Sequence, residues 1–574
     1  MVDSETRPQV ERELHLLGLL LCVSAMIYGW ISWLSWQFEY DSLPQERPIL
    51  LALGLFGILF LIYLVGIRIL RRVADDRRCF RVIIVGSLLF RLTMLFSVPI
   101  LEIDIYRYIW DGAATSSGVS PFRFPPEIVK NADSVVDDPS LQRLVNMRDH
   151  QPALAEVLNR IHFAELPTVY PTASQVVFSL ANITSPEQAS VQTRLLVMKA
   201  WLLAFDLGTL WLVIKLLRIA GRSPSLSIVY GWCPLLIKEV ANSGHLDAIA
   251  VFFTTLTVFL VAKCLVRARN GAAVPWSVCL AVVISFALAV GAKLYPIVLA
   301  PILAGVALRK TGVRRSLIWG GVCVLLIGIL LLPLAYQGTS ANDPSEGLRT
   351  FVNRWEMNDF LFLITVENLR PDDGRGPHAL PWFTVLPDRW RTSLAKVASP
   401  FTIARGITVT VFLLIAARIA RSVARDPGSS NDQVSAWVRG SFLTLAWFWL
   451  LAPTQNPWYW TWALPFLPFA KSRAWLLVSG IVFAYYLRFW FTDHFSNSAV
   501  LGTRYAGPAF YDFVVTWIEF FPWLLFLSFT WASHRASMKR YGGLAPQDEK
   551  HQAIGSVFDP PRSSLHPSVA REEL

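Results

Sequence analysis

The chain has 574 residues, of which 54% are hydrophobic and 16% are charged, with 52 Lys and Arg against 41 Asp and Glu. Soluble domains carry about 25% charged residues, so this low fraction, with apolar runs along nearly the whole chain, excludes a soluble enzyme, a disordered protein and a secreted disulfide scaffold. The six cysteines include no CxxC pair and indicate neither a disulfide framework nor a cysteine metal site.

Fourteen apolar segments are candidate membrane helices, because a spanning helix needs about 20 mostly apolar residues. They predict an all-α polytopic membrane protein with a bundle of about 12–14 transmembrane helices over residues 16–533. Two segments, 225–240 and 457–470, are short enough to be half-spans. Residues 1–15 are expected to form a cytoplasmic N-terminus, and residues 534–574 a disordered cytoplasmic tail. In chain order the segments are 16–34, 49–67, 80–100, 195–217, 225–240, 246–264, 274–291, 294–308, 316–336, 401–419, 436–452, 457–470, 474–491 and 511–532.

The distribution of Lys and Arg orients the bundle, because cytoplasmic loops carry an excess of these residues. One set of short loops and their flanks holds 22 of them, and the alternate set holds 5. The first set is therefore cytoplasmic, both termini are inside, and the long segments 101–193 and 337–400 lie outside. The net charge of +11 follows largely from this asymmetry, so the expected partner is the lipid bilayer and not nucleic acid. The basic set lies at 68–81, 215–222, 263–269, 309–315, 418–439 and 471–473, and the alternate set is Arg47, Lys238, Lys293, Arg488 and Arg504.

Two opposite charges lie at matching depth inside the third and fourth predicted spans. Arg91 lies ten residues beyond Arg81 at the inner end of the third, which is about 15 Å along a helix. Asp206 lies twelve residues beyond Arg194 at the outer end of the fourth. An isolated charge there costs about 2.5–3.5 kcal/mol on insertion scales, so we expect the two side chains to pair directly or through one water. The alternative is that Arg91 bonds backbone carbonyls and Asp206 pairs elsewhere or is protonated.

The segment 101–112, LEIDIYRYIWDG, begins where the third span leaves the membrane on the outside. Glu102 and Asp104 are two residues apart, so a continuous helix would turn only one of them into a shared pocket. A carboxylate at a membrane exit is a suitable general base for a substrate at the lipid surface. The alternative is a hydrated interfacial helix with an Asp–Arg pair. Continued as a helix, the segment aligns four polar residues at i, i+3, i+4 and i+7, namely Asp104, Arg107, Tyr108 and Asp111.

Six short motifs, in order, resemble those of a bacterial group of GT-C glycosyltransferases that use polyprenyl-phosphate sugars. This group includes alpha-mannosyltransferase-like proteins and glycosyltransferase family 87. The first, DIYRYIWDG at 104–112 followed by GVSPF at 118–122, resembles the group's DxYRYxWDGr…Gx(N)PY signature. The others resemble its YPP, GHxD, K-x-x-P, RWxxN and NPWY elements, and are YPTA at 170–173, SGHLDA at 243–248, AKLYP at 292–296, RWEMN at 354–358 and QNPWY at 455–459.

The resemblance covers about residues 85–470 and departs from the group's pattern at Ser120-Pro121-Phe122 and at Thr172. The long acidic segment 126–163 matches nothing and leaves the acceptor open. The resemblance implies a GT-C-like membrane fold in the plasma membrane. It also implies an inverting enzyme that acts outside and transfers a hexose, with mannose favoured, from a polyprenyl-phosphate donor to a glycan or lipid acceptor. It aligns Asp104 with the catalytic aspartate, with Glu102 as the second choice.

Several further residues are candidate substrate-binding groups, each with a structural alternative. Arg107 positions Asp104 or contacts phosphate, or else forms a local pair with an aspartate, while Asp111 is expected to close the helix against backbone donors. Lys293 contacts phosphate or snorkels to the interface. A His-x-Asp pair offers too few ligands for zinc, so neither a metal nor another cofactor is expected. The candidates are Arg107, Tyr108, His245, Asp247, Lys293, Trp355, Asn358, Arg488 and Arg504.

Two other functions stay open at the level of sequence. The first is a transporter or flippase of a lipid-linked sugar, and such transporters commonly show internal repeats and broken helices at the midplane. No repeat is visible here, and the motifs are predicted outside the midplane. The second is an assembly factor that keeps the fold without the chemistry, against which the presence of Asp104 argues.

Overall fold

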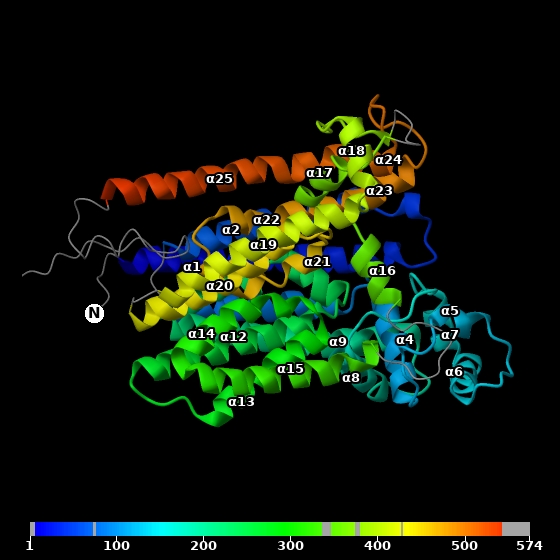
Figure 1. Cartoon of the computed structure of the whole chain (residues 1–574), viewed down its shortest axis with the longest axis horizontal. Helices are drawn as coiled ribbons and strands as arrows, with labels where there is room; N and C mark the ends of the chain where they lie inside the picture. The colour runs from blue at the N-terminus through cyan, green and yellow to red at the C-terminus, as the bar shows by residue number, and fades with distance from the viewer. Residues whose placement is uncertain (1–5, 73–75, 336–345, 373–378, 426–428, 542–574) are drawn as a thin grey trace, which may run out of the picture.

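The computed structural model describes residues 6–72, 76–335, 346–372, 379–425 and 429–541. These residues form helices, together with two isolated bridges. The long helices lie alongside one another in an elongated bundle, with shorter helices gathered at one end (Figure 1).

Nine helices of the described residues are long and apolar enough to cross a membrane. The chain is therefore an all-α polytopic membrane protein, as predicted, but with fewer full-length spans than the fourteen apolar segments suggested. Three predicted spans form α3 (Arg77–Leu95), α13 (Trp276–Ala292) and α14 (Ala300–Thr311), which are too short or too charged to count among the nine. The nine are α1 (Thr6–Leu34), α2 (Ile49–Leu70), α9 (Val191–Ile219), α12 (Asp247–Arg269), α15 (Val313–Ala335), α19 (Pro400–Arg425), α20 (Ser430–Leu451), α22 (Ala474–Ile481) continued through α23 (Leu487–His494), and α24 (Gly507–Phe510) continued through α25 (Thr516–Tyr541).

The two segments with the length of half-spans are broken into short turns and are buried along almost all of their length. Proline interrupts both, since it lacks the N–H that continues a helix. Irregular backbone at membrane depth is tolerated where protein surrounds it, so these segments lie inside the bundle. Their turns are η3 (Pro224–Ser227), α10 (Ile228–Gly231), α11 (Pro234–Leu236) and the π-helical η4 (Ile237–Asn242), and then α21 (Pro457–Trp460) and η7 (Leu464–Phe469).

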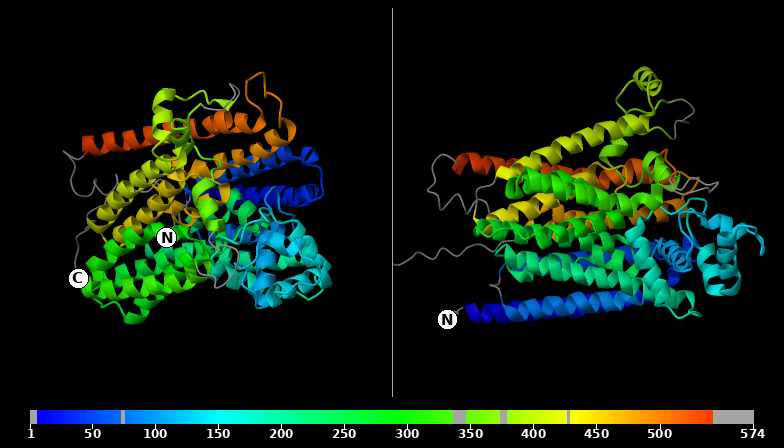
Figure 2. Two further views of the ribbon diagram at one scale, coloured as in Figure 1. Left: turned by 45° about the vertical axis from the view of Figure 1, so that its right-hand side comes forward. Right: turned by 60° about the horizontal axis from the view of Figure 1, so that its bottom comes forward.

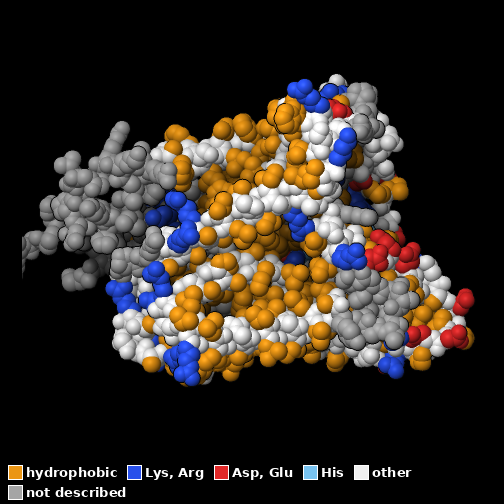
Figure 3. All heavy atoms as spheres, in the orientation of Figure 1, with side chains coloured by type: hydrophobic (Ala, Val, Ile, Leu, Met, Phe, Trp, Pro, Cys, Tyr) orange, Lys and Arg blue, Asp and Glu red, His pale blue; other side chains and the backbone are white. Residues whose placement is uncertain are grey.

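The two long segments predicted to lie outside are at the same end of the bundle, here called the loop end (Figures 1 and 2). The start of α1 and the end of α25 lie at the opposite end, where Lys and Arg side chains gather on the face shown in Figure 3. We call this the basic end. The loop end contains α4 (Ile105–Ser116), α5 (Pro126–Asn131), α6 (Pro139–His150), α7 (Pro152–Asn159), α8 (Thr172–Ile183), α16 (Glu346–Arg354), α17 (Leu361–Glu367) and α18 (Asp388–Ala395).

Two predicted boundaries were wrong. The third span does not continue as one helix into the segment 101–112, because α3 ends at Leu95 and the chain turns at Leu101 (φ 65°) before α4 begins. At the C-terminus α25 extends to Tyr541, so helix replaces the first residues of the predicted tail. Residues 542–574 lie outside the described residues.

Candidate active site

Asp104 stands at the start of α4, at the loop end of the bundle. An aspartate in this position usually accepts a hydrogen bond from its own helix, but the Asp104 side chain forms no such cap. Its half-buried carboxylate accepts a long hydrogen bond from the Tyr170 hydroxyl, at 3.5 Å. The carboxylate is therefore not committed to holding α4 in place.

The packing of α4 against α8 fixes the surroundings of Asp104. Gly112 makes this packing possible, because a Cβ there would lie 2.3 Å from the carbonyl oxygen of Phe178. Tyr108 is buried, stacks on the Phe178 ring at 4.8 Å and meets the Tyr170 ring edge-on at 5.1 Å. Tyr108 thus holds Tyr170, the partner of Asp104.

Glu102 is buried, and one of its oxygens, Oε1, has no hydrogen-bond partner among the described residues. Burial raises the pKa of Glu102 well above its usual range, and the carboxylates of Asp104 and Glu239 add to this rise while the Lys238 ammonium opposes it. The expectation that only one of the two carboxylates enters a shared pocket depended on a continuous helix, and the turn at Leu101 removes that premise.

A buried polar cluster, formed by Lys238, Glu239, His245 and Tyr486, lies beside Glu102. The Lys238 ammonium is hydrogen-bonded to the Tyr486 hydroxyl, which donates to Glu239 at 2.6 Å. His245 Nε2 lies 3.2 Å from a Glu239 carboxylate oxygen, and its ring stacks on Trp458 at 4.3 Å. His245 is therefore held in place by Glu239 and Trp458.

This cluster was not predicted from the sequence. Lys238 was counted only among the basic residues that orient the bundle, and Glu239 was not considered. The available signal was two adjacent charges inside an apolar segment, because ionisable residues within membrane segments commonly mark functional sites. They lie on the π-helical turn η4, a feature found frequently at such sites.

Asp247 and Lys293 form an ion pair that joins the start of α12 to the turn after α13. The Lys293 ammonium lies 2.7 and 2.8 Å from the two carboxylate oxygens, and the Trp462 indole donates to the same carboxylate at 2.5 Å. The ammonium also lies 4.5 Å from the centre of the Tyr459 ring. The Asp247 side chain is 1% exposed and that of Lys293 is 17% exposed, so Lys293 is held inward and does not extend freely to the interface.

Trp355 and Asn358 connect the segment before α17 to the segment before α21. The Met357 backbone pairs with Pro453 and Gln455. Asn358 is buried in the left-handed region (φ 50°), donates to the Gln455 carbonyl at 3.1 Å and accepts from the Tyr511 hydroxyl. Trp355 packs edge-on against Phe163 at 4.6 Å. Asn358 is thus a structural residue, and Trp355 joins the two outer segments.

Three cations predicted to contact phosphate have other partners. Arg107 donates to Asp111 at 2.9 Å and to the Leu166 carbonyl at 3.0 Å, which is the local pair given as its alternative. Asp111 also accepts from the Gln175 side chain, so it is structural, but through side-chain rather than backbone donors.

Arg488 donates to Asp512 at 2.7 Å, and Arg504 donates to the Leu380 carbonyl and to the Tyr505 hydroxyl. Tyr505 packs in a hydrophobic cluster with Phe383 that is distinct from the main core. Both arginines are therefore bonded to partners within the protein.

Arg405, in the second turn of α19, is the cation that the sequence analysis missed. Its guanidinium nitrogen Nη1 is buried and has no hydrogen-bond partner among the described residues. Phe412, seven residues later, belongs to a hydrophobic cluster against which Val298, beyond the Lys293 turn, and Leu361 of α17 pack. Residues i and i+7 share a helix face, so Arg405 is on the same face of α19 as Phe412. Figure 3 shows Lys or Arg side chains at the bottom of a hollow in the surface near α19.

The six motifs, which are spread over more than 350 residues of sequence, meet at the loop end. The segment 104–112 contacts the motifs at 170–173 and 243–248, which in turn link to those at 292–296 and 455–459, and the last pairs with 354–358. In the part of the chain that the structure describes, no group of three or more His, Cys, Asp or Glu side chains forms a metal-binding arrangement. No protein-family model, curated protein or solved structure matches the chain. The linking pairs are Asp104–Tyr170, Ile105–Gly244, Asp247–Lys293, His245–Trp458 and Met357–Gln455.

Proposed function

We propose that the protein is an integral-membrane glycosyltransferase of the plasma membrane. It moves a hexose, with mannose favoured, from a polyprenyl-phosphate sugar to a glycan or lipid acceptor outside the cell. The observation that carries the proposal is the meeting of the six glycosyltransferase-like motifs around Asp104 at one end of the bundle. The likeness of the motifs rests on their residue types, whereas their meeting is a spatial contact in the folded chain. The two observations therefore support each other.

In the proposed reaction Asp104 is the general base. It takes the proton of the acceptor hydroxyl, the acceptor oxygen forms a bond to the anomeric carbon, and the bond from that carbon to the phosphate oxygen breaks. The electron pair leaves with polyprenyl phosphate, and the configuration at the anomeric carbon inverts. Two features support this role: the Asp104 carboxylate does not cap its helix, and the residue is only partly buried.

Glu102 complements Asp104 in this proposal. Its raised pKa, caused mainly by burial, favours the neutral carboxylic acid. A neutral carboxylic acid cannot take up the proton of the acceptor hydroxyl, so the role of the base falls to Asp104 in this proposal. The buried cluster behind Glu102 then serves to position it.

Positive charge for the departing phosphate comes from Lys293 and Arg405. Lys293 is partly exposed and fixed by Asp247, and Arg405 carries a nitrogen without a partner among the described residues. An anionic leaving group needs such preorganised charge more than it needs a proton donor. Guanidinium groups suit phosphate because they donate two parallel hydrogen bonds.

The proposal is tested by incubating the purified protein with a panel of polyprenyl-phosphate sugars and acceptor glycans, and by measuring release of polyprenyl phosphate. Release with one hexose, dependent on acceptor, supports the transferase. A parallel assay in liposomes follows the donor across the bilayer. Movement of intact donor without release of polyprenyl phosphate would support the transporter or flippase instead.

A further inference from the structure

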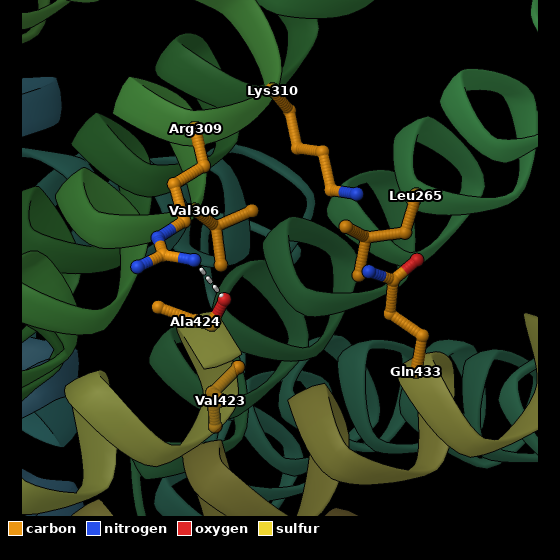
Figure 4. A pocket seen from close by; sticks show the side chains of 7 residues that line it. All are labelled: Leu265, Val306, Arg309, Lys310, Val423, Ala424 and Gln433. Atoms are coloured by element: carbon orange, nitrogen blue, oxygen red, sulfur yellow. Dashed lines mark hydrogen bonds between the residues drawn. The ribbon is translucent and has the colours of Figure 1, made fainter. Parts of the chain in front are cut away.

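A polar cavity lies at the basic end of the bundle, the opposite end from Asp104, and its lining residues are shown in Figure 4. It has a volume of about 390 Å³ and lies where four helices end or begin. Two cations, Arg309 and Lys310, come from the last turn of α14, and Gln433 comes from the first turn of α20. The apolar walls are Leu265 of α12, Val306 of α14, and Val423 and Ala424 of α19.

The polar side chains of the cavity have N–H groups that can bind an anion. Arg309 is anchored, because its guanidinium donates to the Ala424 carbonyl at 2.6 Å. Lys310 reaches into the space between Arg309 and Gln433 (Figure 4). Among the described residues, neither the Lys310 ammonium nor the Gln433 side-chain amide has a hydrogen-bond partner.

Among the residues that the structure describes, no carboxylate lines the cavity. The acidic neighbour in the chain, Asp432, is turned to the start of its own helix, where it bonds Ser429 in a capping box. A fixed guanidinium, a free ammonium and a free amide together form a site for a phosphate group.

The apolar surroundings suit a lipid rather than a free ion. Below the cavity α20 packs tightly on its neighbours, since a Cβ at Gly440 would lie 2.5 Å from Val423 and 2.8 Å from Ile302. The cavity itself has apolar walls, formed by Leu265, Val306 and Val423 at the end of the bundle where the spanning helices leave the membrane. The apolar part of a lipid can lie against these walls while its headgroup contacts the polar side chains.

We propose that this cavity binds the phosphate-bearing headgroup of an anionic phospholipid from the leaflet at the basic end. Basic pockets between spanning helices on the cytoplasmic side are known to bind anionic lipid headgroups. The site is independent of the proposed glycosyl transfer, because it shares no residue with the region around Asp104.

The proposal is tested with the full-length protein in nanodiscs or lipid–detergent micelles. Binding of phosphatidylglycerol is measured by native mass spectrometry, with phosphatidylcholine and inorganic phosphate as separate probes. We expect phosphatidylglycerol to bind and the other two not to compete. Lys310→Gln should weaken binding about fivefold, and Gln433→Glu, which places a carboxylate in the cavity, should weaken it more.

Arg314→Gln removes an exposed charge at the same end but outside the cavity, and it should leave binding unchanged. Equal weakening by Lys310→Gln and Arg314→Gln would mean that the lipid responds to surface charge in general, which overturns the site. Full competition by inorganic phosphate would overturn the assignment to a lipid. A Lys310→Gln variant that binds as well as the wild type, while remaining folded, would also overturn it.

Discussion

Arg91 and Asp206 are hydrogen-bonded to each other in the interior of the bundle, with 2.5 Å between Nε and Oδ2, and both side chains are almost completely buried. The second Asp206 oxygen accepts from the Tyr230 hydroxyl at 2.6 Å. Arg91 also donates to the carbonyls of Ser87 and Gly231. The pair therefore ties α3 and α9 to the broken segment that leads to Lys238 and Glu239.

Replacement of Asp206 by alanine should destabilise the protein strongly. It leaves the Arg91 guanidinium buried without its counter-charge, and removal of one partner from a buried pair typically costs about 3–5 kcal/mol. We expect a lower yield and a lower melting temperature, while the turnover of the surviving protein changes little. Asp149→Ala, which removes an exposed aspartate paired with Arg148, is the control and should change the melting temperature little. Normal yield with collapsed turnover would place Asp206 in the active site instead.

The pH dependence of stability should report the buried Glu102. Burial, more than its charged neighbours, raises the pKa of Glu102, so the folded protein retains this proton after the unfolded chain has lost it. The resulting stabilisation is complete below the usual carboxyl pKa of about 4.3 and is lost as the pH rises through the raised value.

Glu102→Gln keeps the shape and stays neutral at every pH, so it removes this dependence. The melting temperature of Glu102→Gln minus that of the wild type should increase as the pH rises from about 4.5 to about 8. Thermal unfolding of both proteins across this range measures the difference. A difference that is flat with pH, or that falls as pH rises, would show that Glu102 is ionised in the folded protein.

The sequence predicted features that follow from fixed local geometry. The rise of a helix is about 1.5 Å per residue, which was sufficient to place Arg91 and Asp206 at one depth before any contact was known. The Arg107–Asp111 pair follows in the same way from i, i+4 spacing. The alternation of basic loops placed both long segments at one end, and Figure 1 shows them together there.

Features that depend on long-range packing were not predicted. The carboxylate of Glu102 meets the Asp104 region only because the chain turns at Leu101 with φ 65°, and no local pattern required that turn. Arg488 looked like a free outer cation, but it pairs with Asp512, which is 24 residues away in sequence. Arg405 was not considered because an arginine near a helix end resembles an interface anchor, and only the folded structure shows that its Nη1 is buried without a partner among the described residues.

Arg405→Gln should raise the KM for the polyprenyl-phosphate donor. Loss of a charge-assisted hydrogen bond to phosphate typically costs about 1.5–3 kcal/mol, so we expect roughly a tenfold to hundredfold fall in kcat/KM. Arg418→Gln is a matched control, because it removes an exposed arginine from the basic end of the same helix and should change neither constant. Equal kinetics for the two variants would remove Arg405 from the donor site.

Cysteine labelling should show that the loop end faces outward. Val135 and Val397 are 84% and 83% exposed at this end, while Asn270 is exposed in the turn between α12 and α13 at the opposite end. In intact cells an impermeant maleimide should label Val135→Cys and Val397→Cys but not Asn270→Cys, with the wild type giving the background. The reverse pattern would place Asp104 in the cytoplasm and contradict the proposed reaction.

The role of Asp104 as general base is tested most directly by the turnover of Asp104→Asn, which keeps the shape of the side chain and removes its basicity. Acceptor-dependent release of polyprenyl phosphate is measured for this variant and for Asp133→Asn, an exposed aspartate at the loop end. We predict that Asp104→Asn folds normally and loses about 10²–10⁴-fold in kcat, with donor binding retained, while Asp133→Asn keeps wild-type turnover. Near-wild-type turnover of well-folded Asp104→Asn would contradict the assignment of Asp104 as the base.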